Sequence, residues 1–287
     1  MIRTCLACLT TLIAGLALAK EEPLPALDKA ALERARRPIV LSVPGMERVV
    51  VHSNLAYTQT NDPLVRMDIY APADLQADER RPIVMLVHGG VPASLPVKDM
   101  GAYRSWGRLI AAHGMVAVTF THRLRWPLSQ LQESASDVRA AIDFARANAS
   151  QFNAHPDRMC IAAYSAGGPL LTVALQDERR YVRCLLAIYP LVDVQGFGAA
   201  DEAKFALKTY VDGASFPPLF LARAGRDAIP TLNERLDAFI GSAIAANAPI
   251  TIVNHPNGAH GFDVANDDER SREIIRAALE FMKAQLN

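Results

Sequence analysis

Residues 158–168 have the sequence RMCIAAYSAGG, which places a single serine between an apolar run and a pair of glycines. The apolar run at 159–164 is typical of a buried β-strand, and the segment at 167–176 is typical of a helix. A serine at such a junction either caps the helix or is held up to react with a substrate. The rest of the chain must decide between these two roles for Ser165.

Short apolar runs alternate with longer amphipathic segments along the chain. The runs predict strands at residues 48–52, 65–70, 82–88, 115–121, 159–164, 184–189, 218–224 and 250–255. Helix-like segments lie at 27–37, 103–113, 128–149, 167–176, 229–246 and 267–286. The first two runs follow each other closely, as the strands of an antiparallel pair do, whereas the later runs alternate with helices. We therefore predict one α/β domain whose mostly parallel sheet of about eight strands is covered by helices on both faces.

The N-terminal segment MIRTCLACLTTLIAGLALAK has the parts of an export signal. Arg3 provides a positive start, and residues 5–16 form an apolar stretch that is too short to span a bilayer. The tripeptide ALA at 17–19 provides the small residues that a signal peptidase needs. We predict that residues 1–19 are a signal peptide and that the mature protein is secreted or periplasmic, without a stable membrane anchor.

The composition excludes several classes of protein. Of the 287 residues, 51% are hydrophobic and 21% are charged, which excludes disorder for most of the chain. The formal net charge is zero and no block of lysine or arginine stands out, so nothing indicates a nucleic acid or an anionic membrane as a partner. Residues 20–45 are rich in Ala, Pro and charge, and we predict that they form a leader packed on the domain at 46–287.

Two cysteines, Cys160 and Cys184, remain after removal of the signal peptide. Both lie in apolar runs that predict strands, and their spacing matches no metal site. We expect two buried thiols, although a disulfide between neighbouring strands stays open as an alternative in an oxidising compartment.

Four polar residues with catalytic chemistry follow predicted strands. His88, Ser165, Asp227 and His260 each come at or soon after the carboxyl end of a strand. Ligands of an open parallel sheet bind beyond the carboxyl ends of its strands, so these side chains should share one edge. The order serine, acid, histidine along the chain is that of the α/β-hydrolase arrangement and not that of chymotrypsin or subtilisin.

With these residues the sequence resembles the α/β-hydrolase esterases, in the branch that has an HGG motif and a SAGG elbow. That branch includes the hormone-sensitive-lipase-like, acetylxylan-esterase-like and feruloyl-esterase-like enzymes. The resemblance runs from about residue 46 to the C-terminus. It rests on HGG at 88–90, HRLRWP at 122–127, AYSAGG at 163–168, YP at 189–190, GRD at 225–227 and GAHGF at 258–262. It implies an α/β-hydrolase fold, in which the length of residues 190–217 predicts a small cap or none.

The resemblance identifies Ser165 as the nucleophile of a tight turn between a strand and a helix. Small neighbours allow this turn to close, which accounts for Ala163 before the serine and Gly167 after it. The family usually has glycine where Ala163 stands, and a methyl group is small enough to replace it.

A serine nucleophile needs a base within hydrogen-bond reach and an acid that orients the base. We predict His260 as the base because it follows the last strand in a loop that contains glycines, with His255 as the alternative. We predict Asp227 as the acid because it fits the family pattern, with Asp193 as the alternative. Asp263 is expected to cap the last helix instead.

An oxyanion hole should combine the backbone N–H of Ala166 with N–H groups from the turn after His88. We predict Gly90 and Val91 as these donors. The family often has glycine where Val91 stands, but valine still carries the N–H group. His88 is expected to be a structural residue of the turn.

The sequence thus predicts an exported serine hydrolase that cleaves carboxylic esters through an acyl-enzyme, with no metal or organic cofactor. Residues 190–217 leave room for only a small cap, which favours short acyl groups. Export suits a small-molecule or polysaccharide-linked ester as substrate. Two alternatives stay open: a peptidase of the prolyl-oligopeptidase type, and a catalytically silent hydrolase fold used for binding. The natural ester and the oligomeric state are not predicted, and Trp106 and Trp126 are assigned to packing.

Overall fold

The computed structural model describes residues 29–126, 130–176, 180–196, 198–211 and 216–287. The predicted signal peptide at 1–19 lies outside these ranges. Within them, no helix has both the length and the apolar character needed to cross a membrane.

A sheet of eight strands forms the centre of the molecule, in the order β1-β2-β5-β3-β7-β8-β9-β10. The strands are β1 (Val50–Leu55), β2 (Met67–Ala71), β3 (Arg81–Val87), β5 (Val116–Phe120), β7 (Ala154–Tyr164), β8 (Val182–Ile188), β9 (Leu219–Ala224) and β10 (Ile250–His255). β2 runs antiparallel to β1 and β5, and the other neighbouring strands are parallel. The predicted mostly parallel sheet is therefore confirmed. β7 begins well before the predicted start at residue 159, because the polar residues at 155–158 conceal the beginning of the strand in the sequence.

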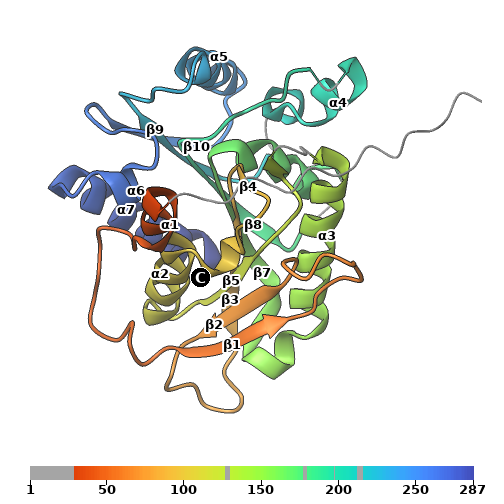
Figure 1. Ribbon diagram of the computed structural model, residues 1–287, viewed down its shortest axis with the longest axis vertical. Helices are drawn as coiled ribbons and strands as arrows, with labels where there is room; N and C mark the ends of the chain where they lie inside the picture. The colour runs from red at the N-terminus through yellow and green to blue at the C-terminus, as the bar shows by residue number, and fades with distance from the viewer. Residues whose placement is uncertain (1–28, 127–129, 177–179, 197, 212–215) are drawn as a thin grey trace, which may run out of the picture.

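Helices cover both faces of the sheet (Figure 1). One face carries α3 (Leu131–Ala147), α5 (Leu232–Ala245) and the 3-10 helix η3 (Ser165–Ala174). The opposite face carries α2 (Gly101–Ala112) and α7 (Glu269–Leu286), and α1 (Lys29–Arg36) contacts α2. The central strands are buried on both sides, which is why they appear in the sequence as continuous apolar runs.

Several short elements complete the fold. They are the helices α4 (Ala199–Lys204) and α6 (Phe262–Ala265), the 3-10 helices η1 (Val97–Asp99), η2 (Ala149–Phe152) and η4 (Leu207–Tyr210), and the paired strands β4 (Val91–Pro92) and β6 (Arg125–Trp126). Two-residue strands carry no periodic signal, and none was predicted. Between β8 and β9 the described residues form only α4 and η4, so the cap is small.

The segment after Ser165 is a 3-10 helix, where the sequence predicted only a helix. Pro169 lies inside it and has no N–H to donate to the Ser165 carbonyl. That carbonyl instead accepts a hydrogen bond of 2.9 Å from the Leu191 N–H. This hydrogen bond ties the start of the helix to the loop after β8.

The N-cap of α7 was predicted wrongly. Asp268 caps this helix, because its side chain accepts a hydrogen bond of 2.8 Å from the Ser271 N–H. Asp263, which was expected to do so, is buried elsewhere.

Cys160 and Cys184 lie side by side in the register of β7 and β8. Both are free, fully buried thiols, as expected, and burial raises the pKa of Cys160 well above its usual value.

Candidate active site

The turn between β7 and η3 holds Ser165 in a backbone conformation that side chains rarely adopt. Its φ of 53° lies in the left-handed region, which costs energy for a residue other than glycine. The turn after β3 packs tightly against this elbow: a Cβ on Gly89 would lie 2.8 Å from the Ser165 Cβ, and a Cβ on Gly167 would lie 2.4 Å from the His88 carbonyl oxygen. The turn and the elbow can therefore approach this closely because residues 89 and 167 are both glycine.

Ser165, His260 and Asp227 form a continuous hydrogen-bonded series. His260 Nε2 lies 2.7 Å from Ser165 Oγ, and His260 Nδ1 lies 2.6 Å from Asp227 Oδ2. The Asp227 side chain is fully buried, and its other oxygen accepts a hydrogen bond of 3.0 Å from the Ile229 N–H. This is the geometry in which a carboxylate orients an imidazole and the imidazole accepts a serine proton.

Backbone contacts hold the loops after β9 and β10 together. The Gly225 N–H donates to the His255 carbonyl at 2.8 Å, and the Arg226 N–H donates to the Gly258 carbonyl at 2.8 Å. These bonds fix the position of Asp227, which follows β9, relative to His260, which follows β10. Residues far apart in the chain thus meet at the carboxyl edge of the sheet.

The two alternative residues from the sequence lie outside this series. His255 is buried against α7, where its Nε2 lies 3.1 Å from both Asp268 Oδ1 and Ser271 Oγ. Asp193 forms an ion pair with Arg235 of α5. The structure therefore brings together the three residues that the sequence favoured.

Tyr189, Asp263 and Trp106 form a buried network that contacts His260 through the Tyr189 ring. The Tyr189 ring packs edge-on against the imidazole, with ring centroids 4.9 Å apart, and its hydroxyl donates to Asp263 Oδ1 at 2.7 Å. Trp106 Nε1 donates to the other oxygen of Asp263 at 2.8 Å. Burial raises the pKa of Asp263, while these two donors and the nearby His260 oppose the rise.

The contacts of this network could not be inferred from the sequence. Tyr189 belongs to the YP pair and Asp263 closely follows His260, but neither position indicates a contact with the other. Trp106 was assigned to packing, and it is indeed 1% exposed, with its indole N–H used by Asp263. The side chain of Trp126 lies outside the described residues.

The turn after β3 is built on two stacked histidines. The rings of His88 and His122 are 3.5 Å apart and nearly parallel, and both side chains are fully buried. His88 Nε2 accepts a hydrogen bond of 3.0 Å from the His122 N–H, and His88 Nδ1 donates to the Gly89 carbonyl at 2.6 Å. Burial lowers the pKa of His88 to about 4 and that of His122 well below its usual value, so both are neutral supports of the turn.

This turn brings Gly90 against the elbow. A Cβ on Gly90 would lie 3.5 Å from the Ala166 Cβ, and the two residues line the same cavity. The Gly89 N–H is used by the Tyr103 hydroxyl at 3.1 Å, whereas no hydrogen bond among the described residues uses the Gly90 N–H. Ala166 lies in the first turn of η3, where N–H groups have no partner within the helix. Val91 is buried in β4, next to Gly90 along the chain.

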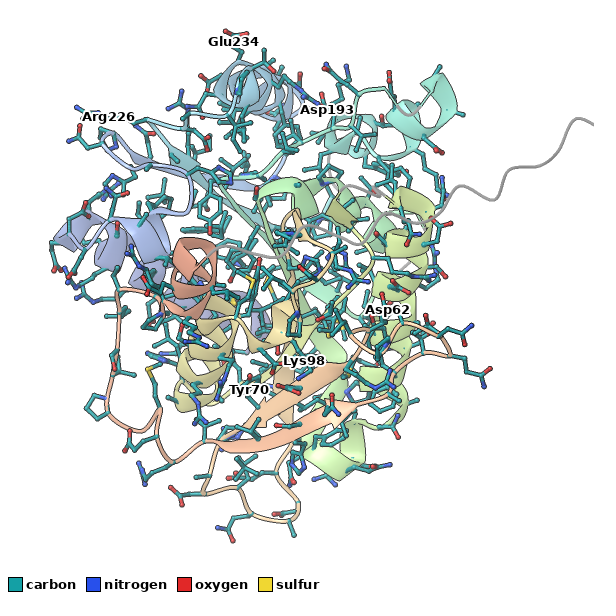
Figure 2. The ribbon with its side chains drawn as sticks, in the orientation of Figure 1. Asp62, Tyr70, Lys98, Asp193, Arg226 and Glu234 are labelled. Carbon is teal, nitrogen blue, oxygen red and sulfur yellow. The ribbon has the colours of Figure 1, made fainter. Side chains whose placement is uncertain are left out.

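A cavity of about 290 Å³ opens beside Gly90 and Ala166. Its walls include the apolar side chains of Leu124, Leu131, Pro169, Leu191 and Val194. The ion pair of Asp193 and Arg235 also lines it, and Figure 2 labels Asp193 near α5, the helix that carries Arg235. In the described part of the chain, no group of His, Cys, Asp and Glu side chains is arranged to hold a metal ion.

Comparison with solved structures shows the α/β-hydrolase fold. An esterase from Thermogutta terrifontis, Est2 with butyrate bound, is 18% identical with a TM-score of 0.64, over 84% of this chain and 95% of that one. Esterase B from Lactobacillus rhamnosis is 18% identical with a TM-score of 0.66, over 83% of this chain and 86% of that one. Both superpose along nearly their full length, so the fold includes no large additional domain in the described residues.

Esterases are among the curated relatives that match by sequence. Esterase LipQ of Mycobacterium tuberculosis is 24% identical over 255 residues, which is 75% of this chain and 58% of the relative. Carboxylesterase 1C of Rattus norvegicus is 32% identical over 111 residues, which is 36% of this chain and 19% of the relative. The chain thus spans less than two thirds of the length of either relative.

A family model covers most of the sheet and two members of the hydrogen-bonded series. The model described as BD-FAE matches residues 67–248, a range that contains Ser165 and Asp227 but ends before β10 and His260. The match extends over more than half of the chain, from β2 through α5. The chain therefore belongs to the BD-FAE family.

Proposed function

We propose that this protein is a serine hydrolase of carboxylic esters, with Ser165, His260 and Asp227 as its catalytic triad. The observation that carries the proposal is the hydrogen-bonded series from Ser165 Oγ through both ring nitrogens of His260 to Asp227. The esterases among its relatives and structural neighbours give independent support. The His260 side chain is 27% exposed, so a substrate and a water molecule can reach it.

The reaction follows from the roles that this geometry permits. His260 Nε2 takes the proton of Ser165 as Oγ attacks the ester carbonyl carbon, and a tetrahedral intermediate with a negative oxygen forms. When the intermediate collapses, the same nitrogen gives the proton to the leaving alcohol and the acyl group stays on Ser165. Water then attacks the acyl-enzyme with His260 as its base, which releases the acid and restores the serine. Asp227 orients the imidazole and stabilises the imidazolium in both steps.

The negative oxygen needs hydrogen-bond donors at the elbow. We propose the N–H groups of Ala166 and Gly90 as these donors, with that of Val91 as a third. The first turn of η3 also places the positive end of backbone dipoles at this point. Each such donor typically contributes about 100- to 1,000-fold to the rate.

The acyl group is proposed to be short. A cavity of about 290 Å³ is at the small end of ligand sites, and the link between β8 and β9 is too short to form a large lid. A structural neighbour holds butyrate, a four-carbon acid, which agrees with this size. The small cap also argues against a peptidase that depends on a large accessory domain.

The N-terminal sequence supports export as a further part of the proposal. Cleavage of residues 1–19 would release a secreted or periplasmic enzyme whose substrate is a small-molecule or polysaccharide-linked ester. The test is the intact mass of the protein recovered from the periplasm or medium of cells that express the whole chain. A protein that stays in the cytoplasm with residue 1 or 2 at its N-terminus would contradict export.

The esterase proposal is tested with an active-site probe. We expect a fluorophosphonate to label the wild type and p-nitrophenyl acetate and butyrate to be hydrolysed, and both activities to vanish in Ser165→Ala. Ser271→Ala is the matched control, because Ser271 also lies 3.1 Å from a histidine nitrogen but is fully buried outside the series. Labelling that survives in Ser165→Ala, or is lost only in Ser271→Ala, would refute the assignment.

A further inference from the structure

His260 interacts with a second carboxyl group, in addition to that of Asp227. Asp263 lies in α6, three residues after His260, and it is 1% exposed. The Tyr189 ring connects the two residues, since the ring packs against the imidazole and its hydroxyl donates to Asp263 Oδ1. Burial raises the pKa of Asp263 and a charge on His260 opposes this rise, so the two groups interact electrostatically.

The contacts of Asp263 suit a carboxylate. Trp106 Nε1 can only donate, and it donates to Oδ2, while the Tyr189 hydroxyl donates to Oδ1. Both oxygens are therefore acceptors, and neither contact needs a proton on the carboxyl group. Among the described residues, no lysine or arginine forms an ion pair with Asp263. A buried negative charge that lacks a cationic partner favours the appearance of a positive charge nearby.

The other polar side chains that face Asp263 are neutral. They are the indole of Trp106 and the hydroxyl groups of Tyr103, Tyr164 and Tyr189. Burial raises the pKa of all three tyrosines, so they keep their protons at the pH of the reaction. The polar groups that contact His260 are Ser165 and Asp227. A positive charge on the imidazole would therefore be stabilised by two carboxylates, one in direct contact and one across the Tyr189 ring.

Backbone contacts hold this arrangement in place before a substrate binds. Tyr189 has a φ of 39°, in the left-handed region, and its N–H donates to the Ala222 carbonyl at 2.7 Å. The Asp263 carbonyl accepts a hydrogen bond of 2.8 Å from the Val40 N–H. A strained residue such as Tyr189 persists only where the surrounding structure enforces it. The ring and the carboxylate are thus fixed relative to the site.

We infer that Asp263 is a positioning residue that acts through His260, because its buried negative charge stabilises the imidazolium that forms when Ser165 attacks the ester. The inference rests on the proposed esterase function. During attack the proton of Ser165 Oγ moves to His260 Nε2, which makes the ring positive, and it later passes to the leaving alcohol. Asp263 neither gives nor takes a proton in these steps. A charge that is already in place needs no reorganisation when the imidazolium forms.

Asp263→Asn tests this role because it removes the charge and keeps the shape. The asparagine oxygen can accept from Trp106 and its NH₂ group can donate to the Tyr189 hydroxyl, so both contacts can remain. The assay is kcat/KM for p-nitrophenyl butyrate as a function of pH. Its acid side reports protonation of the essential base, and its midpoint is the pH at which kcat/KM is half of the plateau value.

Two linked changes are expected in Asp263→Asn. The midpoint should move about 0.5–1 pH unit lower, because without the nearby negative charge the imidazolium is less stable and forms only at lower pH. The plateau should fall about 3- to 10-fold for the same reason, since the imidazolium of the transition state loses the same stabilisation. A purely structural role would lower the plateau without moving the midpoint.

Asp268→Asn is the matched control. Asp268 also contacts a histidine, but that histidine is His255, and the Asp268 side chain is 42% exposed. Asparagine caps helices as well as aspartate does, so α7 should stay intact. We expect the midpoint and the plateau of wild type. A midpoint that moves as far as in Asp263→Asn would overturn the inference, because loss of any nearby charge would then suffice.

Asp263→Ser protects the test against misfolding of the asparagine variant. Its smaller side chain is also neutral and can accept from Trp106, so we expect the same direction of both changes. Thermal unfolding identifies which of the two variants is folded. A wild-type midpoint in a folded variant, or a midpoint at higher pH, would overturn the inference and leave the esterase function intact. Absence of ester turnover by the wild type would instead overturn the proposed function.

Discussion

Replacement of Asp227 by asparagine tests the triad through its tautomer. Asp227 Oδ1 accepts from the Ile229 N–H at 3.0 Å, and Oδ2 faces His260 Nδ1 at 2.6 Å. An asparagine keeps its one oxygen on the Ile229 N–H and turns its NH₂ group toward the imidazole. Nδ1 must then accept a hydrogen bond, so the ring proton moves to Nε2, which can no longer accept the proton of Ser165.

The expected loss in Asp227→Asn is roughly 10,000-fold in kcat, the size that a wrong tautomer causes in serine proteases. KM for p-nitrophenyl butyrate should change little, because Asp227 does not line the cavity beside Gly90 and Ala166. The assay is steady-state hydrolysis, with active-site titration to exclude contamination by wild type. Thermal unfolding checks that the buried side chain is replaced without loss of the fold.

Asp237→Asn is the control for this prediction. Asp237 is a surface carboxylate that pairs with Arg223 and has no contact with His260. Its replacement should leave kcat within about twofold, since exposed ion pairs contribute little. A kcat for Asp227→Asn above one tenth of wild type, in a folded protein, would refute the role of Asp227.

Other predictions follow from the packing around the site. In Gly89→Ala the new methyl group would lie 2.8 Å from the Ser165 Cβ. We therefore expect the free energy of unfolding to fall by about 1–3 kcal/mol and kcat/KM to fall as well. Thermal unfolding that is unchanged from wild type would contradict this prediction. The pKa of His88 is lowered from 6.5 to about 4 in the folded protein. As the pH falls below about 6.5, the unfolded chain therefore takes up a proton that the folded protein does not. The contribution of His88 should therefore lower the free energy of unfolding by about 2 kcal/mol between pH 7 and pH 4.5. Urea denaturation at the two pH values measures this change. An unfolding free energy that is the same at both pH values would contradict the prediction. Tyr189→Phe removes the hydroxyl that donates to Asp263 at 2.7 Å but keeps the ring against the imidazole, so stability should fall by about 1–3 kcal/mol while kcat falls less than about tenfold. Wild-type stability in this variant would show that the hydrogen bond to Asp263 is not needed.

The sequence predicts those parts of the molecule that depend on local patterns. The central strands are buried on both faces and appear as apolar runs, so their order along the chain and the parallel sheet could be inferred. Ser165, Asp227 and His260 could be named because each follows a strand whose carboxyl end shares one edge of the sheet, and because the resemblance to the α/β-hydrolase esterases favoured Asp227 over Asp193. Neither inference needs knowledge of side-chain contacts.

The features that could not be predicted from the sequence depend on contacts between residues that lie far apart in the chain. Trp106 and Asp263 are hydrogen-bonded across 157 positions, and nothing local to either residue marks the other as its partner. Asp263 precedes the last helix in the sequence and was therefore expected to cap it. In the structure, the N-cap of this helix is Asp268. Arg235 is one of several charged residues of an amphipathic helix, and only the folded chain places it in the cavity.

The two histidines at the end of β10 and in the loop after it show why residue types alone do not define a triad. His255 has a serine and an aspartate as neighbours, Ser271 and Asp268, as His260 has. However, both of these neighbours contact the same nitrogen, Nε2, at 3.1 Å, while its Nδ1 is buried without a hydrogen-bond partner in the described chain. Asp268 contacts Nε2, the nitrogen that also contacts Ser271, so it cannot hold Nδ1 in its protonated form. His255 is therefore not oriented to accept a proton from Ser271. The difference between His255 and His260 therefore lies in which ring nitrogen each partner contacts.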